Sequence, residues 1–373
     1  MSDLPGVAPA VGTHVERAQR FLARCGAQAL LILKGENRRY VTGFTGSAGL
    51  VLVTPTEVLL AVDFRYEEQA AAEAPACKVI RGGRDPLAAL AAATQAMTLS
   101  TVGFESEFVS YAQAGRLREK LAPAELVPIA DVDRLRWVKD PAELAAISGA
   151  VEIADAAFIY MLGVLRPGLS ERETAVELES FMRRAGAERI SFESVVATGP
   201  RSALPHGRPT GRVMEIGDLV TLDFGAVVDG YCSDCTRTVV VGIPDERQRA
   251  VYHVVLDAQR RALEMIRGGV SCREVDAGAR SVIAAAGFGD AFGHALGHGL
   301  GLDVHEGPRL SPTEETPLKP GMVVTVEPGI YLPGWGGVRI EDDVVVTADG
   351  CRVLTRAPKE LQLLPGTFVH GSS

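Results

Sequence analysis

The first third of the chain carries short apolar runs separated by longer stretches in which apolar residues recur at helical spacing. Apolar runs bounded by turn residues predict strands at residues 27–33, 49–54 and 57–64. Amphipathic spacing predicts helices at residues 13–25, 65–75, 85–98 and 112–121. Together these segments predict a small α/β domain that covers residues 1–133.

Two helix-start signals open the rest of the chain, residues 134–373. Asp140 stands directly before Pro141, so a carboxylate can cap a long helix and proline can occupy its first turn. Ser170 and Glu173 have the spacing of a capping box at the start of the next helix. Two more helices are predicted at residues 244–267 and 271–286. After them, the C-terminal third is expected to be mostly strand and loop.

Composition narrows the kind of protein. A chain of 373 residues is long enough for two domains. Lys plus Arg number 38 and Asp plus Glu 47, and a net charge of −9 argues against non-specific binding to nucleic acid. We find no apolar run of membrane-spanning length, and residues 1–14 lack the basic and apolar regions of a secretory signal. Six scattered cysteines suit reduced thiols, so we expect a cytoplasmic protein without membrane partners.

Two aspartates lie on a predicted β-hairpin with its turn at Asp229-Gly230. A two-residue turn places Asp234 opposite Gly225, and a shift of one residue pairs it directly with Asp223. Both registers put the two carboxylates on the same face. Because two like charges are costly on a largely apolar hairpin, this pattern predicts a positive group between them.

Two glutamates repeat the pattern near the C-terminus. Glu327 ends the apolar run "MVVTVE", and Glu341 lies between "GGVRI" and "VVVT". A carboxylate in a buried strand is costly unless it is paired. His298, in "HALGHGLGLDVHE", is the natural fifth member of the set. Four oxygen donors and one imidazole suit two divalent cations, with Mn²⁺ or Co²⁺ favoured over Zn²⁺.

The segment around His298 has glycine at every second position: Gly297, Gly299 and Gly301. One interpretation is an ordinary glycine-rich turn. The other is a site where glycine leaves room for a metal or substrate to approach the main chain closely. The surrounding carboxylates favour the second interpretation.

The motifs "GHGLGLDVHE", "VEPGIY" and "GGVRIEDD" resemble those of the pita-bread metallopeptidases, a family that includes prolidase, aminopeptidase P, methionine aminopeptidase and the metal-free creatinase. "RRYVTGFTGSAG" and "LLAVDFRYEEQA" resemble the creatinase/prolidase N-terminal domain, which methionine aminopeptidases lack. The resemblance therefore implies an α/β (α+β) protein of two domains from the proline-specific branch. Residues 1–133 would form the N-terminal domain and residues 134–373 the pita-bread catalytic domain.

The resemblance also implies a set of metal ligands. Asp223 and Glu341 would bridge two metal ions, and Glu327 would also move a proton. All five ligand positions of the family are filled here, by Asp223, Asp234, His298, Glu327 and Glu341.

Further residues match positions on the substrate side of the family site. His206, in "LPHGRP", would face the substrate near the scissile nitrogen, and His294 would lie on the same side. His305, in "DVHE", would stabilise the oxyanion. Arg339, in "GVRIED", would help proton transfer or order Glu341.

These resemblances imply hydrolysis of the bond between an N-terminal residue and proline. Arg309, in "HEGPRL", resembles an arginine of microbial prolidases and suits the free carboxylate of a dipeptide. "GHGLGLDVHE" lacks the tryptophan found in many long aminopeptidases P, which favours a prolidase over an aminopeptidase P that acts on longer peptides. A non-catalytic peptide-binding relative would have lost ligands, and creatinase relatives lack this ligand set. The family usually forms homodimers, and we expect one here.

Overall fold

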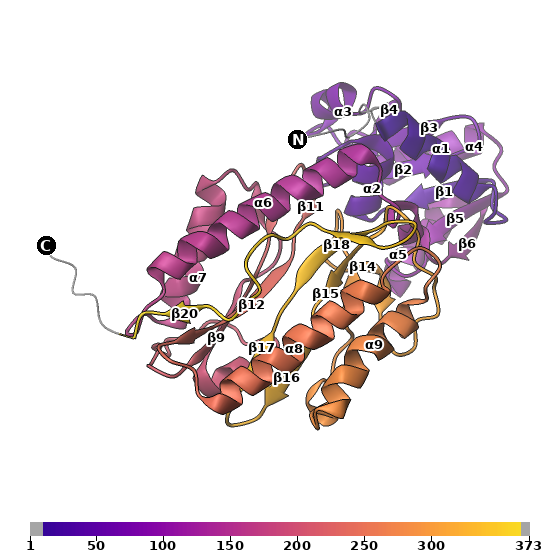
Figure 1. Ribbon diagram of the computed structural model, residues 1–373. Helices are drawn as coiled ribbons and strands as arrows, with labels where there is room; N and C mark the ends of the chain where they lie inside the picture. The colour runs from indigo at the N-terminus through magenta and orange to yellow at the C-terminus, as the bar shows by residue number, and fades with distance from the viewer. Residues whose placement is uncertain (1–9, 367–373) are drawn as a thin grey trace, which may run out of the picture. The chain divides into compact units, whose positions relative to one another are not determined.

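The computed structural model describes residues 10–366 and divides into two compact units, the first ending at Arg136 and the second beginning at Trp137. The expectation that the chain lacks a secretory signal concerns residues 1–14, and residues 1–9 of these lie outside the described residues. Each unit mixes helices with sheets, as expected for the two-domain fold (Figure 1).

The first unit is built on a six-stranded sheet. Its strands are β1 (Ala29–Ile32), β2 (Leu50–Val53), β3 (Val58–Val62), β4 (Lys78–Arg81), β5 (Thr101–Glu105) and β6 (Glu125–Ile129). They lie in the order β4-β3-β2-β1-β5-β6, and β2 is antiparallel to both of its neighbours while the other pairs are parallel. The helical segments are α1 (Ala10–Leu22), α2 (Gly35–Thr42), α3 (Glu67–Glu73), α4 (Pro86–Ala96), α5 (Tyr111–Leu121) and the 3-10 helix η1 (Val132–Arg136).

The three strands and four helices predicted for this unit are confirmed, with ends that differ by a few residues. The sequence did not reveal α2, β4, β5 or β6. Charged residues flank the two apolar residues of β4, β6 contains Pro128, and α2 buries polar Asn37 and Arg38, so none of them shows a simple apolar period.

The second unit contains the four helices expected from the sequence, α6 (Pro141–Val164), α7 (Glu171–Arg184), α8 (Glu246–Met265) and α9 (Cys272–Ala285). Asp140 caps α6 by accepting hydrogen bonds from the backbone N–H groups of Ala142 and Glu143. Ser170 and Glu173 form the predicted capping box on α7. These caps satisfy N–H groups that have no partner inside the helix and so fix where each helix begins.

The expectation that no segment reaches membrane-spanning length was wrong for α6. Its most apolar window has a mean hydropathy of 1.5, and its 24 residues are enough to cross a bilayer by length and composition alone. The buried residues, however, follow one helical face from Glu143 to Met161. They pack against the strands of the unit, so α6 has the pattern of a core helix.

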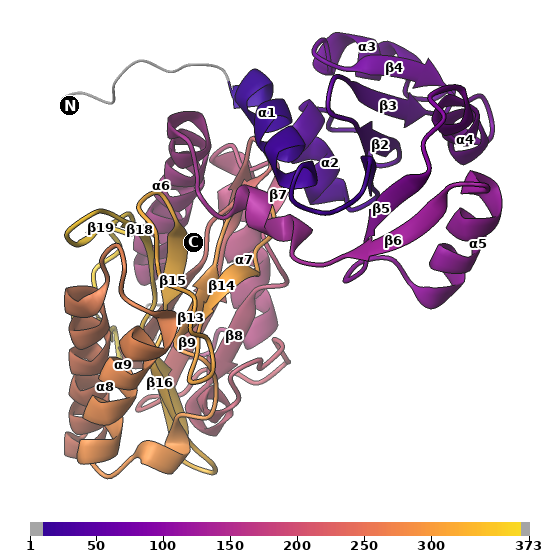
Figure 2. The same ribbon diagram turned by 90° about the vertical axis from the view of Figure 1, so that its right-hand side faces the viewer.

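The strands of the second unit lie between two helix pairs, with α6 and α7 on one side and α8 and α9 on the other (Figures 1 and 2). One sheet has the order β20-β12-β9-β8, and another has the order β14-β13-β15-β18-β19. Two smaller sheets are β11-β10-β7 and β16-β17. The strand bounds are β7 (Arg189–Ile190), β8 (Val195–Thr198), β9 (Leu219–Phe224), β10 (Ala226–Val228), β11 (Tyr231–Cys232), β12 (Cys235–Val241), β13 (Gly297–Gly299), β14 (Glu306–Leu310), β15 (Val323–Val326), β16 (Gly329–Leu332), β17 (Gly336–Arg339), β18 (Asp342–Val346), β19 (Cys351–Val353) and β20 (Leu363–Leu364).

Apolar residues on both faces of these sheets hold the unit together. Leu222 and Val239 pack toward α6 and α7, while Val324 and Val344 pack toward α8 and α9. Burial of apolar area of this kind contributes about 25 cal/mol per Å² to stability. Packing on both faces makes the sheets a rigid support for the polar side chains at their strand ends.

The hairpin prediction is confirmed, and its register is now decided. Val228 pairs with Tyr231 around the turn at Asp229-Gly230, where both turn residues have positive φ. Asp223 pairs with Thr236, so the direct Asp223–Asp234 pairing is wrong. The same register continued places Asp234 opposite Gly225, because the turn has two residues.

Candidate active site

A cavity of about 520 Å³ lies in the second unit. It brings together all ten residues singled out from the sequence, which come from segments far apart in the chain. They are His206, Asp223, Asp234, His294, His298, His305, Arg309, Glu327, Arg339 and Glu341. The lining also includes residues that the sequence did not single out, among them Phe192, Glu193, Ser194 and Arg208.

The carboxylates are positioned by strand ends. Asp223 lies on β9, and Asp234 directly precedes β12, its neighbour in the sheet. Glu327 follows β15, and Glu341 directly precedes β18, with which β15 pairs. The two sheets are linked at the site, because the Thr236 hydroxyl donates to Glu341 Oε2 at 2.7 Å.

His298 presents one ring nitrogen to these carboxylates. Its Nδ1 donates to the carbonyl oxygen of Gly299 at 3.0 Å, which leaves the Nε2 lone pair free to accept. Nε2 lies 3.6 Å from Asp234 Oδ2 and 3.4 Å from Glu327 Oε1. Burial lowers the pKa of His298 to about 4, so the ring is neutral at pH 7 and suited to bind a cation.

The acidic groups repel one another in a buried place. Burial, together with the neighbouring carboxylates, raises the pKa of both Asp234 and Glu341 well above the ordinary range. Burial likewise raises the pKa of Glu327 to about 8. Such a cluster holds its negative charge at neutral pH only when positive charge is placed among the oxygens.

Arg339 supplies part of that charge from one side. Its Nη2 donates to Asp223 Oδ2 at 2.5 Å, and its Nε donates to Thr236 Oγ1 at 2.9 Å. Nη1 donates to the hydroxyl of Tyr331, which lies 3.0 Å from His294 Nε2. The sequence did not point to Tyr331 or Thr236, although Tyr331 is the last residue of the motif "VEPGIY".

The donor set fits two divalent cations. The oxygen and nitrogen donors of Asp234, His298 and Glu341 lie within 4.8 Å of one another. Asp223 Oδ1 is buried and has no hydrogen-bond partner among the described residues, although its other oxygen binds Arg339. An unsatisfied buried oxygen beside three further carboxylates suits a hard divalent cation.

The glycines near His298 allow close packing of neighbouring protein atoms. A Cβ at Gly297 would lie 2.0 Å from the carbonyl oxygen of Thr325, and one at Gly299 would lie 2.2 Å from that of Gly307. At Gly301 the nearest atoms would belong to the Glu306 carboxylate. The glycines therefore make room for neighbouring protein atoms, chiefly backbone, and Gly297 also lines the cavity.

Histidines and arginines occupy the remaining wall of the cavity. The rings of His298 and His305 lie 4.4 Å apart, centroid to centroid. Arg309 pairs with His298 between β14 and β13, and its side chain is exposed. Arg208 forms an exposed ion pair with Glu193 at 3.2 Å. The sequence signal for Arg208 was its place two residues after His206, in "LPHGRP".

Comparison with known proteins matches both parts of the chain to known families. The profile of metallopeptidase family M24 matches residues 145–348, and that of the creatinase/prolidase N-terminal domain matches residues 14–138. An Xaa-Pro dipeptidase of Pyrococcus furiosus is 40% identical over 93% of this chain and 99% of its own length.

Solved structures agree with these matches. An Xaa-Pro dipeptidase from Bacillus anthracis superposes with a TM-score of 0.92 at 43% identity, covering 95% of this chain and 100% of that one. An X-Pro aminopeptidase from Thermotoga maritima gives a TM-score of 0.86 at 40% identity, covering 93% of this chain and 100% of that one.

Proposed function

Because this chain belongs to metallopeptidase family M24, we propose that it hydrolyses the bond between an N-terminal residue and proline, with Xaa-Pro dipeptides as its preferred substrates. The observation that carries the proposal is a set of four carboxylates and His298 in a cavity that also contains Arg309; Asp234, His298 and Glu341 of this set are buried. A proline amide has no N–H, so a peptidase cannot grip the bond through that group and needs a dedicated site.

Asp223, Asp234, His298, Glu327 and Glu341 would hold two divalent cations. Bound there, the cations would lower the pKa of a water molecule and polarise the scissile carbonyl. The donor chemistry favours Mn²⁺ or Co²⁺ over Zn²⁺.

The other residues act on the substrate and its protons. Glu327 is the carboxylate that the family resemblance assigns to proton transfer, and it lines the cavity beside His298. Burial lowers the pKa of His305, so its neutral ring can donate a hydrogen bond to the developing oxyanion. His206 lies in a loop that lines the cavity, where it can face the proline nitrogen.

The presence of Arg309 in the cavity favours dipeptidase activity over aminopeptidase activity. A dipeptide ends in the free carboxylate of proline, and an exposed guanidinium in the cavity can bind it through paired hydrogen bonds. The likeness to an X-Pro aminopeptidase keeps the longer-peptide activity as the second candidate.

Hydrolysis of Ala-Pro and Ala-Pro-Ala distinguishes the dipeptidase from the aminopeptidase. Each peptide is assayed in Mn²⁺ and in EDTA. Cleavage of Ala-Pro alone, abolished by EDTA, supports the dipeptidase. Efficient cleavage of Ala-Pro-Ala supports the aminopeptidase. Failure to cleave either peptide with Mn²⁺, Co²⁺ or Zn²⁺ contradicts the proposal.

We further propose a homodimer in the cytoplasm. All six cysteines carry free thiols, which suits a reducing compartment. The dimer rests on the family resemblance, and the mass of the purified protein in solution tests it.

A further inference from the structure

One loop between β8 and β9 carries several of the residues that line the cavity. It comprises residues 198–212: it begins at the end of β8, includes the 3-10 helix η2 (Gly199–Ala203) and returns toward β9. Pro205, His206 and Arg208 line the cavity from this loop. Because a catalytic group must be held within a fraction of an ångström, something has to fix the loop.

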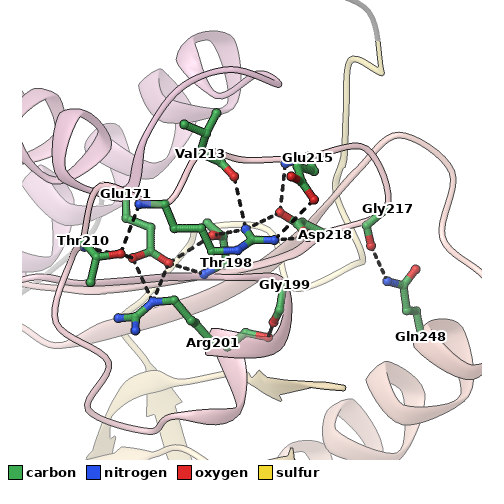
Figure 3. A network of polar contacts seen from close by, with 12 residues as sticks. Glu171, Thr198, Gly199, Arg201, Thr210, Val213, Glu215, Gly217, Asp218 and Gln248 are labelled. Atoms are coloured by element: carbon green, nitrogen blue, oxygen red, sulfur yellow. Dashed lines mark hydrogen bonds and ion pairs between the residues drawn. The ribbon is translucent and has the colours of Figure 1, made fainter. Parts of the chain in front are cut away.

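Glu171, the first residue of α7, is completely buried behind the loop. Its Oε1 accepts from the backbone N–H of Thr198 at 2.9 Å and from the Thr198 hydroxyl at 3.0 Å. Its Oε2 accepts from the backbone N–H of Thr210 at 2.9 Å and from the Thr210 hydroxyl at 2.6 Å. Figure 3 shows these contacts converging on the one carboxylate.

Thr198 and Thr210 stand at the two ends of the loop, so the Glu171 carboxylate closes its base. Arg201, from within the loop, donates through Nε to both Glu171 oxygens at 3.1 and 3.0 Å. The same guanidinium donates through Nη2 to the carbonyl oxygen of Arg208 at 2.7 Å. Glu171 is thereby connected through Arg201 to the part of the loop that faces the cavity.

A second ion pair supports the base of the loop. Arg212 donates to both carboxylate oxygens of Asp218, at 2.6 and 3.0 Å, and to the Thr198 hydroxyl at 2.5 Å. Near the tip, Arg339 Nη1 donates to the carbonyl oxygen of Pro205 at 3.1 Å. The loop is thus fixed at its base by Glu171 and at its tip by the arginine that binds Asp223.

We propose that Glu171 is a positioning residue for the reaction: it holds the loop so that His206 and Arg208 line the cavity that contains the metal-binding carboxylates. The inference rests on the proposed peptidase function. Glu171 does not line the cavity and would act only through the loop. Burial acts to raise its pKa, but the hydrogen bonds from Thr210 and Thr198 outweigh burial and the net pKa is lowered, which matches a carboxylate kept charged by its partners.

The test compares Glu171→Gln with wild type. The amide has nearly the same volume, but its NH₂ group replaces one acceptor and faces N–H and O–H donors. Thr210→Val is a milder second variant, which removes the 2.6 Å hydroxyl contact to Glu171 and the 3.2 Å contact from the backbone N–H of Arg212. Ser271→Ala is the matched control, because it removes a helix cap on α9 at a cost of about 1 kcal/mol without touching the loop.

Two readouts are measured on the metal-loaded protein. We expect kcat for Ala-Pro to fall by about 10- to 100-fold in Glu171→Gln, with a much smaller change in KM. Thr210→Val should show a smaller loss in kcat. We also expect faster amide hydrogen exchange in residues 198–212 of both variants, with the rest of the second unit unchanged. Ser271→Ala should show neither effect.

Unchanged exchange at residues 198–212, or a kcat no lower than that of Ser271→Ala, would overturn the inference. So would a loss of protection spread over the whole unit, which marks a structural role only. Should wild type fail to cleave Ala-Pro, the proposed function fails on its own, and the exchange data still report whether Glu171 holds the loop.

Discussion

Arg339 binds one oxygen of Asp223 and leaves the other without a hydrogen-bond partner among the described residues. The guanidinium therefore orients the Asp223 carboxylate without saturating it. The free oxygen, Oδ1, remains available to a cation. Arg339 also reaches Tyr331 and Thr236, so a single side chain sets the geometry on one side of the site.

Replacement of Arg339 by lysine should reduce kcat/KM for Ala-Pro by about 100-fold or more, because one ammonium cannot reproduce the planar set of donors. The ion pair is buried, so the metal-free variant should also lose a few kcal/mol of unfolding free energy. Steady-state kinetics and urea unfolding measure the two effects. Wild-type kinetics in the lysine variant would contradict the role given to Arg339.

Loss of the single imidazole donor should empty at least part of the metal site. In His298→Ala the Nε2 atom that faces Asp234 and Glu327 is removed, so we expect the bound metal per chain to fall and activity to drop by about 100-fold or more. Elemental analysis after desalting gives the metal content. His253→Ala, which lies outside the cavity lining, is the control and should retain full occupancy.

Stabilisation by metal should depend on pH in a defined direction. The raised pKa values of Asp234, Glu341 and Glu327 mean that the folded metal-free site holds protons that the unfolded chain releases. Stability of the metal-free protein is therefore lost as pH rises above about 4, where unfolded carboxyl groups ionise. For Glu327 the loss continues until its folded pKa of about 8.

A bound cation offsets this penalty, so the increase in melting temperature on adding Mn²⁺ to chelated protein should be larger at pH 8 than at pH 5.5. Thermal unfolding at both pH values, at one Mn²⁺ concentration, measures the difference. An equal increase at the two pH values would show that these carboxyl groups do not exchange protons for metal.

Arg309 decides between the two candidate substrates. We expect Arg309→Ala to raise KM for Ala-Pro by about 10- to 100-fold, because a charge-assisted bond to the proline carboxylate is lost. Cleavage of Ala-Pro amide, which has no carboxylate, should change little. Arg352→Ala, on the exposed part of β19, controls for loss of one positive charge. Equal changes in KM for Ala-Pro and for Ala-Pro amide would show that Arg309 does not bind the proline carboxylate.

Alanine at Gly297 should destabilise the protein and displace His298. The added Cβ would lie 2.0 Å from a backbone oxygen of β15, and backbone cannot yield as a flexible side chain can. We expect a cost of about 1–3 kcal/mol and weaker metal binding. Urea unfolding together with metal titration tests both expectations, and Gly211→Ala, where the Cβ meets nothing within 4 Å, is the control.

Much of the framework was encoded locally. Asp140-Pro141 and the Ser170–Glu173 box predicted two helix starts because capping involves residues within one turn. Asp229-Gly230 predicted the hairpin because a two-residue turn needs positive φ. The same turn put Asp223 and Asp234 on one face, and isolated carboxylates in apolar runs marked the rest of the cluster.

The sequence by itself determined the helix starts, the hairpin and the kinds of donor that gather in the second unit, because each depends on neighbours along the chain. Only the tertiary structure decided how Arg339 joins Asp223 to Tyr331 and how Glu171 closes the loop that carries His206. Arg339 and Asp223 are 116 positions apart, and no local period records such a contact. It exists because two sheets, which share one apolar core on the side of α8 and α9, bring their polar strand ends to the same cavity.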